Sequence, residues 1–351
     1  MSVSRRGSYG LMMIAGLLAG CAGEVPIETR IANALPAAMV QAKGETEAVA
    51  TANADAADDP AIWRNAGNPA ASLIVGTDKK AGLHVYGLDG RSRDFAAAGL
   101  VNNVALVRAS DGRVIVVASD RNDPARAKIA LYALDTVAAK LSPIGKVDAG
   151  AGEAYGICTY APPAASSDTL VQVVSVLKGG SIALIEIAKD LSAKTVRTWK
   201  VPTQAEGCVV ESVSGAVYVG EEDVGIWRFS ILGDDTQGRL IARADGKQLV
   251  ADVEGLAIAF GERRYLVASS QGDNAYTVYS LPDHRYLGRF RIAAGRFGPV
   301  EETDGIELKM GDFGPDYPQG LFVAQDGMNE PRAQNFKLVS WADVKAALGL
   351  E

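Results

Sequence analysis

The chain has 351 residues and a mass of 36.7 kDa, with 22% charged residues and 48% from the AVILMFWYC set. This ordinary globular balance excludes a disordered or collagen-like protein. There are 35 lysines and arginines against 42 acidic residues, so the chain is net acidic at −7 and is not expected to bind nucleic acid. Its two histidines, His84 and His284, are too few for a histidine-cluster zinc site and leave only two candidate bases for a Ser-His-Asp triad.

The first twenty residues are typical of an export signal. Two arginines precede an apolar stretch, Leu11–Leu18, which is shorter than the roughly 20 residues that a membrane-spanning helix needs. Small residues then lead to Cys21, so we expect a bacterial lipoprotein signal over residues 1–20 and a lipid on Cys21. A plain secretory signal with an incidental cysteine is the alternative. Residues 21–45 lack periodicity and are expected to form a tether. The protein should then be exported and anchored by its lipid in the cell envelope, at the outer membrane.

The rest of the chain repeats a unit of about 50 residues that carries two signals in one register. The first is an apolar strand, a polar turn and a second strand, with copies that begin at Leu73, Val114, Val171, Ala216, Tyr265 and Leu321. The second is a polar residue before a short apolar strand, with copies that begin at Asp59, Asn102, Tyr155, Glu206, Glu254 and Asp304. About four short strands in each unit are typical of a propeller blade. We therefore predict an all-β fold, a six-bladed β-propeller over residues 46–351; an irregular β-sandwich is the alternative.

Three further features concern the ends of the propeller and its cysteines. Residues around Glu47–Ala52 are expected to add an outer strand to the last blade and so close the ring. Helical periodicity is confined to the stretch Trp341–Leu350. Cys158 and Cys208 lie near the starts of inner strands in consecutive blades, where a disulfide would join the third and fourth blades. Two buried free thiols are the alternative.

Acidic residues gather at one mouth of the predicted ring. The first strand of each propeller blade lines the central channel, so the residues just before these strands converge. The acids at or next to these positions are Asp58, Asp59, Glu206, Asp252, Glu254 and Asp304. Carboxylates that face one small volume repel each other by several kcal/mol unless cations lie among them. Oxygen ligands without histidine or cysteine favour Ca²⁺ or Mg²⁺, and Ca²⁺ accepts ligands in flexible geometry. We expect several Ca²⁺ ions here, with Tyr155 at their edge.

Basic residues recur at one position of the repeat. Lys79 and Lys80 follow the second strand of the first blade, Arg121 follows that of the second blade, and Lys178 that of the third. All four should face the same side of the ring. A metal cluster beside an arc of lysine and arginine is suited to holding phosphate. Gln271, in the matching turn of the fifth blade, is a further candidate for hydrogen bonding to phosphate.

Several stretches, in this order along the chain, resemble the β-propeller phytases of bacteria. They are Asp58–Trp63, Asp78–Leu83, Glu206–Gly207, Ala251–Leu256, Ala268–Asn274, Thr303–Ile306, Gly320–Gly327 and Gln334–Lys337. The resemblance runs from about Glu45 to Trp341. It implies a six-bladed propeller that hydrolyses phosphate monoesters of phytate (myo-inositol hexakisphosphate), as a 3-phytase does. It also implies dependence on Ca²⁺, and a cleavage site next to an affinity site for a second phosphate.

Carried over residue by residue, the resemblance implies roles for particular side chains. The calcium ligands would be Asp59, Glu206, Glu222, Asp252, Glu254 and Asp304, with Tyr155 beside them. The phosphate ligands would be Lys79, Arg121 and Lys178, with Lys80, Tyr155 and Gln271 as further contacts. This chain departs from the family pattern at Arg64-Asn65, at Ala105 and at Gly179-Gly180. The last two departures concern one calcium ligand or one affinity-site contact, and they leave the fold unaffected.

These features predict a mechanism and a partner. A water activated by Ca²⁺ would attack phosphorus in line, with Glu206 and Glu254 holding the ions and Lys79, Arg121 and Lys178 stabilising the charge on phosphate. The partner would be phytate or a related inositol phosphate, and we expect a monomer whose only membrane contact is the lipid. Two alternatives stay open on the residues alone: another Ca²⁺-dependent propeller hydrolase such as a lactonase, and a non-enzymatic envelope scaffold lipoprotein.

Overall fold

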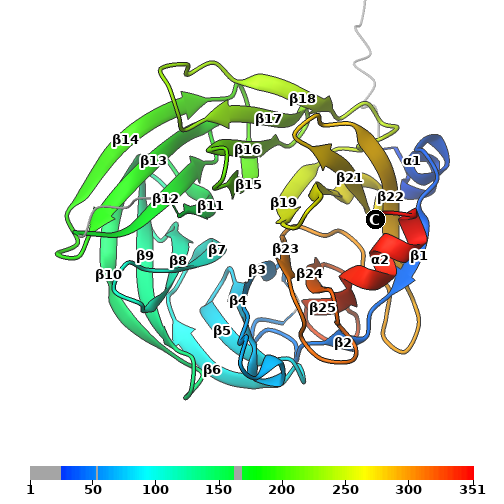
Figure 1. The fold of residues 1–351 in the computed structure, drawn as a ribbon, viewed down its shortest axis with the longest axis horizontal. Coiled ribbons are helices and arrows are strands. Elements are labelled where there is room, and N and C mark those ends of the chain that lie inside the picture. Colours follow the sequence, from blue (N-terminus) through cyan, green and yellow to red (C-terminus); the bar gives the residue numbers. More distant parts are fainter. Residues whose placement is uncertain (1–24, 53, 162–167) are drawn as a thin grey trace, which may run out of the picture.

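Six β-sheets stand in a ring in the computed structural model, which describes residues 25–52, 54–161 and 168–351 (Figure 1). The predicted six-bladed β-propeller is therefore confirmed. The innermost strands of the six blades contact one another around the full circle. The predicted signal over residues 1–20 and the lipidation site Cys21 lie outside the described residues.

The blades follow one another along the chain. Blade 1 consists of β3 (Ala57–Trp63), β4 (Leu73–Asp78), β5 (Gly82–Gly87) and β6 (Ser92–Ala97). Blade 2 consists of β7 (Val101–Arg108), β8 (Val114–Asp120), β9 (Arg126–Asp135) and β10 (Lys140–Ala151). Blade 3 consists of β11 (Ala154–Tyr160), β12 (Thr169–Leu177), β13 (Ser181–Ala188) and β14 (Ala193–Lys200). Blade 4 consists of β15 (Ala205–Glu211), β16 (Ala216–Glu221), β17 (Gly225–Ser230) and β18 (Arg239–Arg243).

The last two blades each include a strand from the N-terminal part of the chain. Blade 5 consists of β19 (Val253–Ala259), β20 (Arg264–Ser270), β21 (Ala275–Leu281), β22 (Tyr286–Ala293) and β1 (Ala38–Gln41). Blade 6 consists of β23 (Ile306–Met310), β24 (Gly320–Asp326), β25 (Asn335–Ser340) and β2 (Gly44–Glu45). The helices are α1 (Ile27–Asn33), α2 (Trp341–Leu348) and the 3-10 turns η1 (Pro69–Ala71) and η2 (Gln271–Asp273).

The hydrophobic core is divided among the blade interfaces. Second strands such as β4 and β16 are buried along their whole length, because both of their faces pack against a neighbouring blade. Outer strands are largely exposed, as in β6, and carry polar residues. One apolar cluster lies between blades 1 and 2, including Val75 and Val116, and another lies between blades 6 and 1, including Ile74 and Phe336. Burial of these faces fixes the order and tilt of the sheets, and thereby the position of the innermost strands.

The predicted tether over residues 21–45 is wrong for the part that the structure describes. β1 runs parallel to β22 and extends blade 5, and β2 pairs with β25 and completes blade 6. Helix α1 packs against η2, and the carbonyl of Leu35 accepts a hydrogen bond from the buried Arg289. These segments cover sheet edges that would otherwise expose unpaired backbone groups. An outer strand from the N-terminal part completes the last blade, as expected, but it is Gly44–Glu45 and ends before the predicted stretch Glu47–Ala52.

The C-terminal helix is where the sequence places it. Helix α2 begins at Trp341, whose ring is fully buried, and ends before Gly349, which has a φ of 64° and so suits glycine. The helix packs against β1, β22 and β24, which links blades 5 and 6. Among the described residues, neither helix has the length and hydropathy to cross a lipid bilayer.

Candidate active site

Glycines at the starts of the inner strands allow acidic residues of neighbouring blades to converge. Glu206 is followed by Gly207, and a Cβ on Gly207 would lie 2.1 Å from the backbone oxygen of Glu254 in the next blade. A Cβ on Gly156 would lie 1.8 Å from the backbone oxygen of Glu206. No side chain fits at such distances, so glycine is required for this close approach. The repeated polar-glycine pair of the sequence thus brings the strands that carry the site into contact.

Three buried glutamates form the centre of the site. One carboxylate oxygen each of Glu206, Glu222 and Glu254 lies within 4.8 Å of the others. The amide of Asn102 donates to Glu206 at 2.9 Å and that of Gln204 donates to Glu222 at 2.8 Å. Glu254 Oε2 has no hydrogen-bond partner among the residues that the structure describes. A buried carboxylate oxygen without a donor is costly, which is the environment expected of a cation ligand.

Burial and mutual repulsion make these carboxyls weak acids. Burial, followed by Asp58 and Asp304, raises the pKa of Glu206 well above its usual range. Burial and Glu206 do the same for Glu254. Burial, followed by the charge of Asp252, raises the pKa of Glu222 to about 7. Near neutral pH these three carboxyls must bind either protons or cations, because their negative charges would otherwise repel one another.

Lys79 neutralises a second set of carboxylates beside the first. Its Nζ lies 2.9 Å from Asp55, 3.0 Å from Asp58 and 2.9 Å from Asp304. Gln271 donates a hydrogen bond of 2.6 Å to Asp304. Burial raises the pKa of Asp304 to about 7, although Lys79 opposes that shift. Lys79 therefore binds protein carboxylates in the structure, whereas the sequence predicted it as a phosphate ligand.

Tyr155 connects the glutamates to two cations. Lys178 Nζ lies 5.1 Å from the centre of the Tyr155 ring, and the Arg121 guanidinium lies 6.0 Å from it. Gln204 donates to the Tyr155 hydroxyl at 3.3 Å. Burial, followed by the charges of Glu206 and Glu254, raises the pKa of this phenol, so it stays protonated. Arg121 also forms an ion pair of 3.4 Å with Glu153. A cationic surface of Arg121, Lys178 and Tyr155 thus borders the acidic group.

A sequence profile of the phytase family matches residues 10–351, nearly the whole chain. The chain belongs to the phytase family. It is 36% identical over 330 residues to a protein named 3-phytase from Bacillus subtilis (strain 168), and the alignment covers 88% of this chain and 85% of that protein. The family resemblance seen in the sequence is therefore confirmed.

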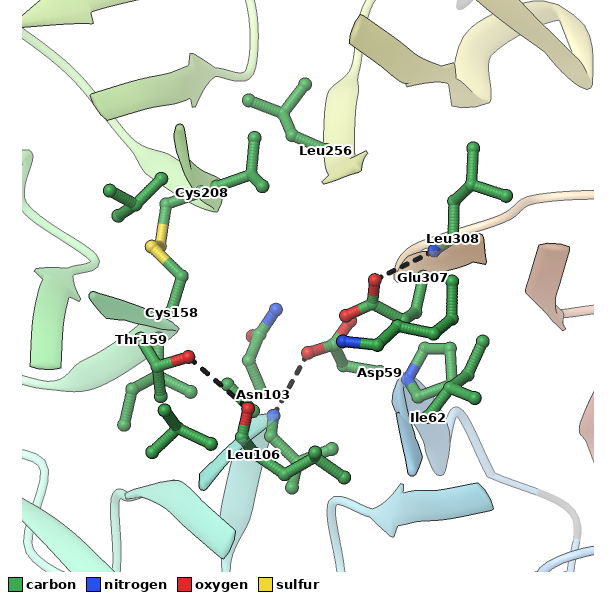
Figure 2. A pocket seen from close by; sticks show the side chains of 18 of the residues that line it. Asp59, Ile62, Asn103, Leu106, Cys158, Thr159, Cys208, Leu256, Glu307 and Leu308 are labelled. Atoms are coloured by element: carbon green, nitrogen blue, oxygen red, sulfur yellow. Dashed lines mark hydrogen bonds between the residues drawn. A yellow bond between two sulfur atoms is a disulfide. The ribbon is translucent and has the colours of Figure 1, made fainter. Parts of the chain in front are cut away.

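The structure of this phytase-family chain places two predicted residues away from the site. Asp59 Oδ2 accepts a hydrogen bond of 3.0 Å from the backbone of Val104, and its side chain faces Glu307 in the channel (Figure 2). Successive residues of a strand point to opposite sides, and Asp58 is the one that reaches Lys79. A register irregularity at the start of β3 decides which of the two faces the mouth. Lys80 is exposed, and its backbone N–H bonds to Asp78.

A cavity of about 660 Å³ lies along the channel behind the acidic group. Figure 2 shows Asp59 and Glu307 on one wall and the Cys158–Cys208 disulfide on another. Cys158 and Cys208 have Cα atoms 5.8 Å apart and join β11 to β15, the strands that carry Tyr155 and Glu206. The disulfide lies on the channel side, so it supports the site from behind without facing it.

Sequence reasoning missed two residues of the site. Gln204 bridges Glu222 and Tyr155, and it lies two residues before Glu206 on the same chain segment. That spacing, which puts two residues on one side of an extended chain, could have identified it. Asp55 pairs with Lys79 from the loop before β3, where no periodicity gives a signal.

Proposed function

We propose that this chain hydrolyses phosphate monoesters of phytate to inorganic phosphate and lower inositol phosphates, and that it depends on Ca²⁺. The relative named 3-phytase supports the substrate and the reaction. The observation that carries the metal dependence is the group Glu206, Glu222 and Glu254, buried and close together beside cationic side chains. An acidic protein and a polyanionic substrate repel each other, and cations between them remove that repulsion.

The donor atoms fit calcium ions. Glu206, Glu222 and Glu254 supply carboxylate oxygens, and histidine and cysteine have no part in this group. Asp58 Oδ1 and Glu254 Oε2 are buried without a hydrogen-bond partner among the described residues, so both have a lone pair to give to an ion. Asp58, Asp252 and Asp304 would complete the ligand set as more than one ion binds. When bound, the ions would supply positive charge for phosphate oxygens and make water a better nucleophile at neutral pH.

The chain's own residues bind and orient the phosphate. Arg121 and Lys178 project beside Tyr155, where they can hold the oxygens of a phosphate that lies against the acidic group. The Tyr155 hydroxyl, which stays protonated, forms a hydrogen bond with Glu206 and so holds that carboxylate next to the two cations. Lys79 keeps Asp58 and Asp304 in place, and Gln271 holds the other oxygen of Asp304. In the reaction the oxygen of water bonds to phosphorus, the ester P–O bond breaks, and the inositol hydroxyl leaves with a proton.

Release of inorganic phosphate from phytate tests the proposal. We expect release with added Ca²⁺, none in chelator, and recovery when Ca²⁺ is restored. The double variant Glu206→Gln/Glu254→Gln should be inactive yet folded, while Glu262→Gln, an exposed acid outside the site, should behave as wild type. Full activity in chelator, or hydrolysis of lactones in place of phosphate esters, would contradict the proposal.

We further propose that the protein is a monomer held in the cell envelope by a lipid on Cys21. The support for the lipid is the sequence Leu18-Ala19-Gly20-Cys21 after a short apolar stretch. Incorporation of labelled palmitate into the wild type, and its loss in Cys21→Ser, would test the lipid. Light scattering of a chain that begins after Cys21 would test the monomer.

A further inference from the structure

A second cavity, of about 650 Å³, lies between blades 4 and 5 at the end of the sheets away from the acidic group. The strand register fixes this position. In blade 4 the pair Ala216–Ser230 lies at the cavity end and the pair Glu221–Gly225 at the acidic end. In blade 5 Arg264 pairs with Leu281 at the cavity end, and Ser270 pairs with Ala275 at the other. The cavity therefore shares no lining residue with the proposed active site.

Two arginines in this cavity lie directly opposite each other on adjacent strands. Arg228 of β17 and Arg239 of β18 are Cα partners in the antiparallel ladder. Side chains of such partners leave the sheet on the same face, about 5 Å apart at Cβ, and like charges in that arrangement repel. Both residues line the cavity. A like-charge pair facing an open cavity is a position where an anion would be stabilising.

The partners of the two guanidinium groups are neutral side chains. Arg239 Nη2 lies 3.0 Å from His284 Nδ1, and the Tyr218 hydroxyl lies 3.1 Å from His284 Nε2. Because arginine only donates, Nδ1 accepts, and the neutral ring carries its proton on Nε2 and donates it to Tyr218. Burial lowers the pKa of His284, and Arg239 and Arg228 lower it further, so the ring stays neutral. Neither Arg228 nor Arg239 forms an ion pair with a carboxylate of the described residues, although Glu211 lies in the same cavity.

The buried acid of the cavity is already paired. Glu211 is fully buried and accepts from Arg264 and from the Ser214 hydroxyl. The other acid, Asp235, lies on the exposed loop before β18 and accepts from the backbone of Gln237. Arg228 also forms a hydrogen bond with the Tyr218 hydroxyl, and Arg239 Nη2 contacts His284. The donors that remain for a ligand are the other N–H groups of the two guanidinium groups and the Tyr218 hydroxyl hydrogen.

We propose that this cavity is a second binding site for a phosphate group, free or carried by a small organic molecule. Two guanidinium forks and a phenol provide several donors to one tetrahedral anion, and guanidinium pairs with phosphate through two parallel bonds. A volume of about 650 Å³ exceeds that of a phosphate ion, so there is room for the molecule that carries it. The site is independent of hydrolysis, because its lining lies away from the acidic group.

Phosphate binding in chelator tests the site without turnover. Inorganic phosphate and phytate are titrated separately by calorimetry into the wild-type chain and into Arg228→Gln/Arg239→Gln. Loss of two charged hydrogen-bond donors should weaken binding at this site at least about tenfold. Weakening for both probes identifies a phosphate-carrying molecule as a ligand, and weakening for inorganic phosphate alone identifies the free ion. Any binding at Arg121 and Lys178 is common to all chains and cancels in the comparison.

A matched double variant controls for net charge. Arg93→Gln/Arg113→Gln also removes two arginines, which are exposed and ion-paired to Asp89 and Asp111. It should bind phosphate as the wild type does, and both double variants should hydrolyse phytate with Ca²⁺ within about twofold of wild type, because distant sites act independently. Equal weakening in both variants, unchanged binding in Arg228→Gln/Arg239→Gln, or no binding by the wild type would overturn the proposal. If the double variant misfolds, the single variant Arg239→Gln, at an exposed side chain, replaces it in the same titrations.

Discussion

Glu254 is buried with a free carboxylate oxygen, so its charge is costly to the fold and useful to a cation. Glutamine has nearly the same shape without the charge. We expect Glu254→Gln to slow phosphate release from phytate by about a hundredfold or more, because cation binding is weakened. In chelator the same variant should unfold several degrees higher than the wild type, because the repulsion from Glu206 is gone. Enzyme assays and calorimetry on the same preparation measure the two opposite effects.

A loss of activity together with a gain in unfolding temperature distinguishes a metal ligand from a structural residue. A merely structural Glu254 would lose stability on substitution in chelator and in Ca²⁺ alike. Glu262→Gln, at an exposed position, should change neither quantity.

Lys79 and Lys178 occupy equivalent positions of the repeat, and both were predicted to bind phosphate. Their surroundings in the structure differ. Lys79 is buried among Asp55, Asp58 and Asp304, whereas Lys178 is half-buried beside Tyr155. Lys79→Met leaves three carboxylates without their cation and should cost about 3–5 kcal/mol of the free energy of unfolding in chelator. Added Ca²⁺ should restore part of it. Lys178→Met should unfold close to wild type but raise the KM for phytate. Equal stability of the two variants in chelator would show that Lys79 is not a structural cation.

Residue types and spacing identified the site, but not every orientation. The acid-glycine pairs marked Glu206 and Glu254, because their glycines are required where inner strands touch. Whether Asp58 or Asp59 faces the mouth depends on a register irregularity in β3, and no residue pattern predicts that irregularity. The partners of Lys79 come from both ends of the chain, so local spacing could not reveal them.

At the scale of elements, the disulfide joins two strands that each carry a site residue. Cys158 in β11 and Cys208 in β15 lie 50 residues apart in sequence. Closing a loop of that length stabilises a fold by about 4 kcal/mol in the chain-entropy model. Cys158→Ser/Cys208→Ser should therefore unfold several degrees below wild type under non-reducing conditions. Its unfolding temperature should equal that of the wild type measured in reductant. If variant and wild type unfolded at the same temperature both with and without reductant, this prediction would be contradicted.

The N-terminal elements show why a tether was expected and a packed segment was found. β1 is only four residues long and pairs with β22, some 250 residues later in the chain. A strand so short has too few residues to show alternation, and its partner lies far outside any local window. β1 pairs with β22 because the outer edge of β22 has unpaired backbone groups. That edge exists only once the blade has formed, so the local sequence around β1 gives no sign of it.

At the scale of the whole molecule, the repeat made the fold predictable. Each blade buries both faces of its middle strands against neighbours, so each of the six units had to repeat the same apolar pattern. The direction of the inner strands then placed the acids at one mouth. The carboxyls of Glu206, Glu222, Glu254 and Asp304, whose pKa values are raised, therefore lie together at this mouth, and this has a consequence for the pH dependence of stability.

The metal-free protein should lose stability as the pH rises from about 4 to 8. Glu222 and Asp304 have folded-state pKa values of about 7, above their usual 4.5 and 3.8, so the folded chain binds more protons than the unfolded chain in this window. Stability from these groups is fully present below the unfolded pKa and is lost as the pH rises through 7. Glu45 is shifted the other way, to a pKa of about 2, and acts only at lower pH.

Calcium should reverse this trend, because the ions replace protons on the same carboxylates. The gain in unfolding temperature on adding Ca²⁺ should therefore be small at pH 5 and grow by pH 8. Calorimetry of dialysed, metal-free protein at pH 5, 6, 7 and 8, with and without Ca²⁺, measures both trends. The double variant Glu206→Gln/Glu254→Gln should show a flatter pH profile and a smaller calcium gain. A metal-free unfolding temperature that rises between pH 5 and 8 would mean that the carboxyls at the mouth do not share one buried volume.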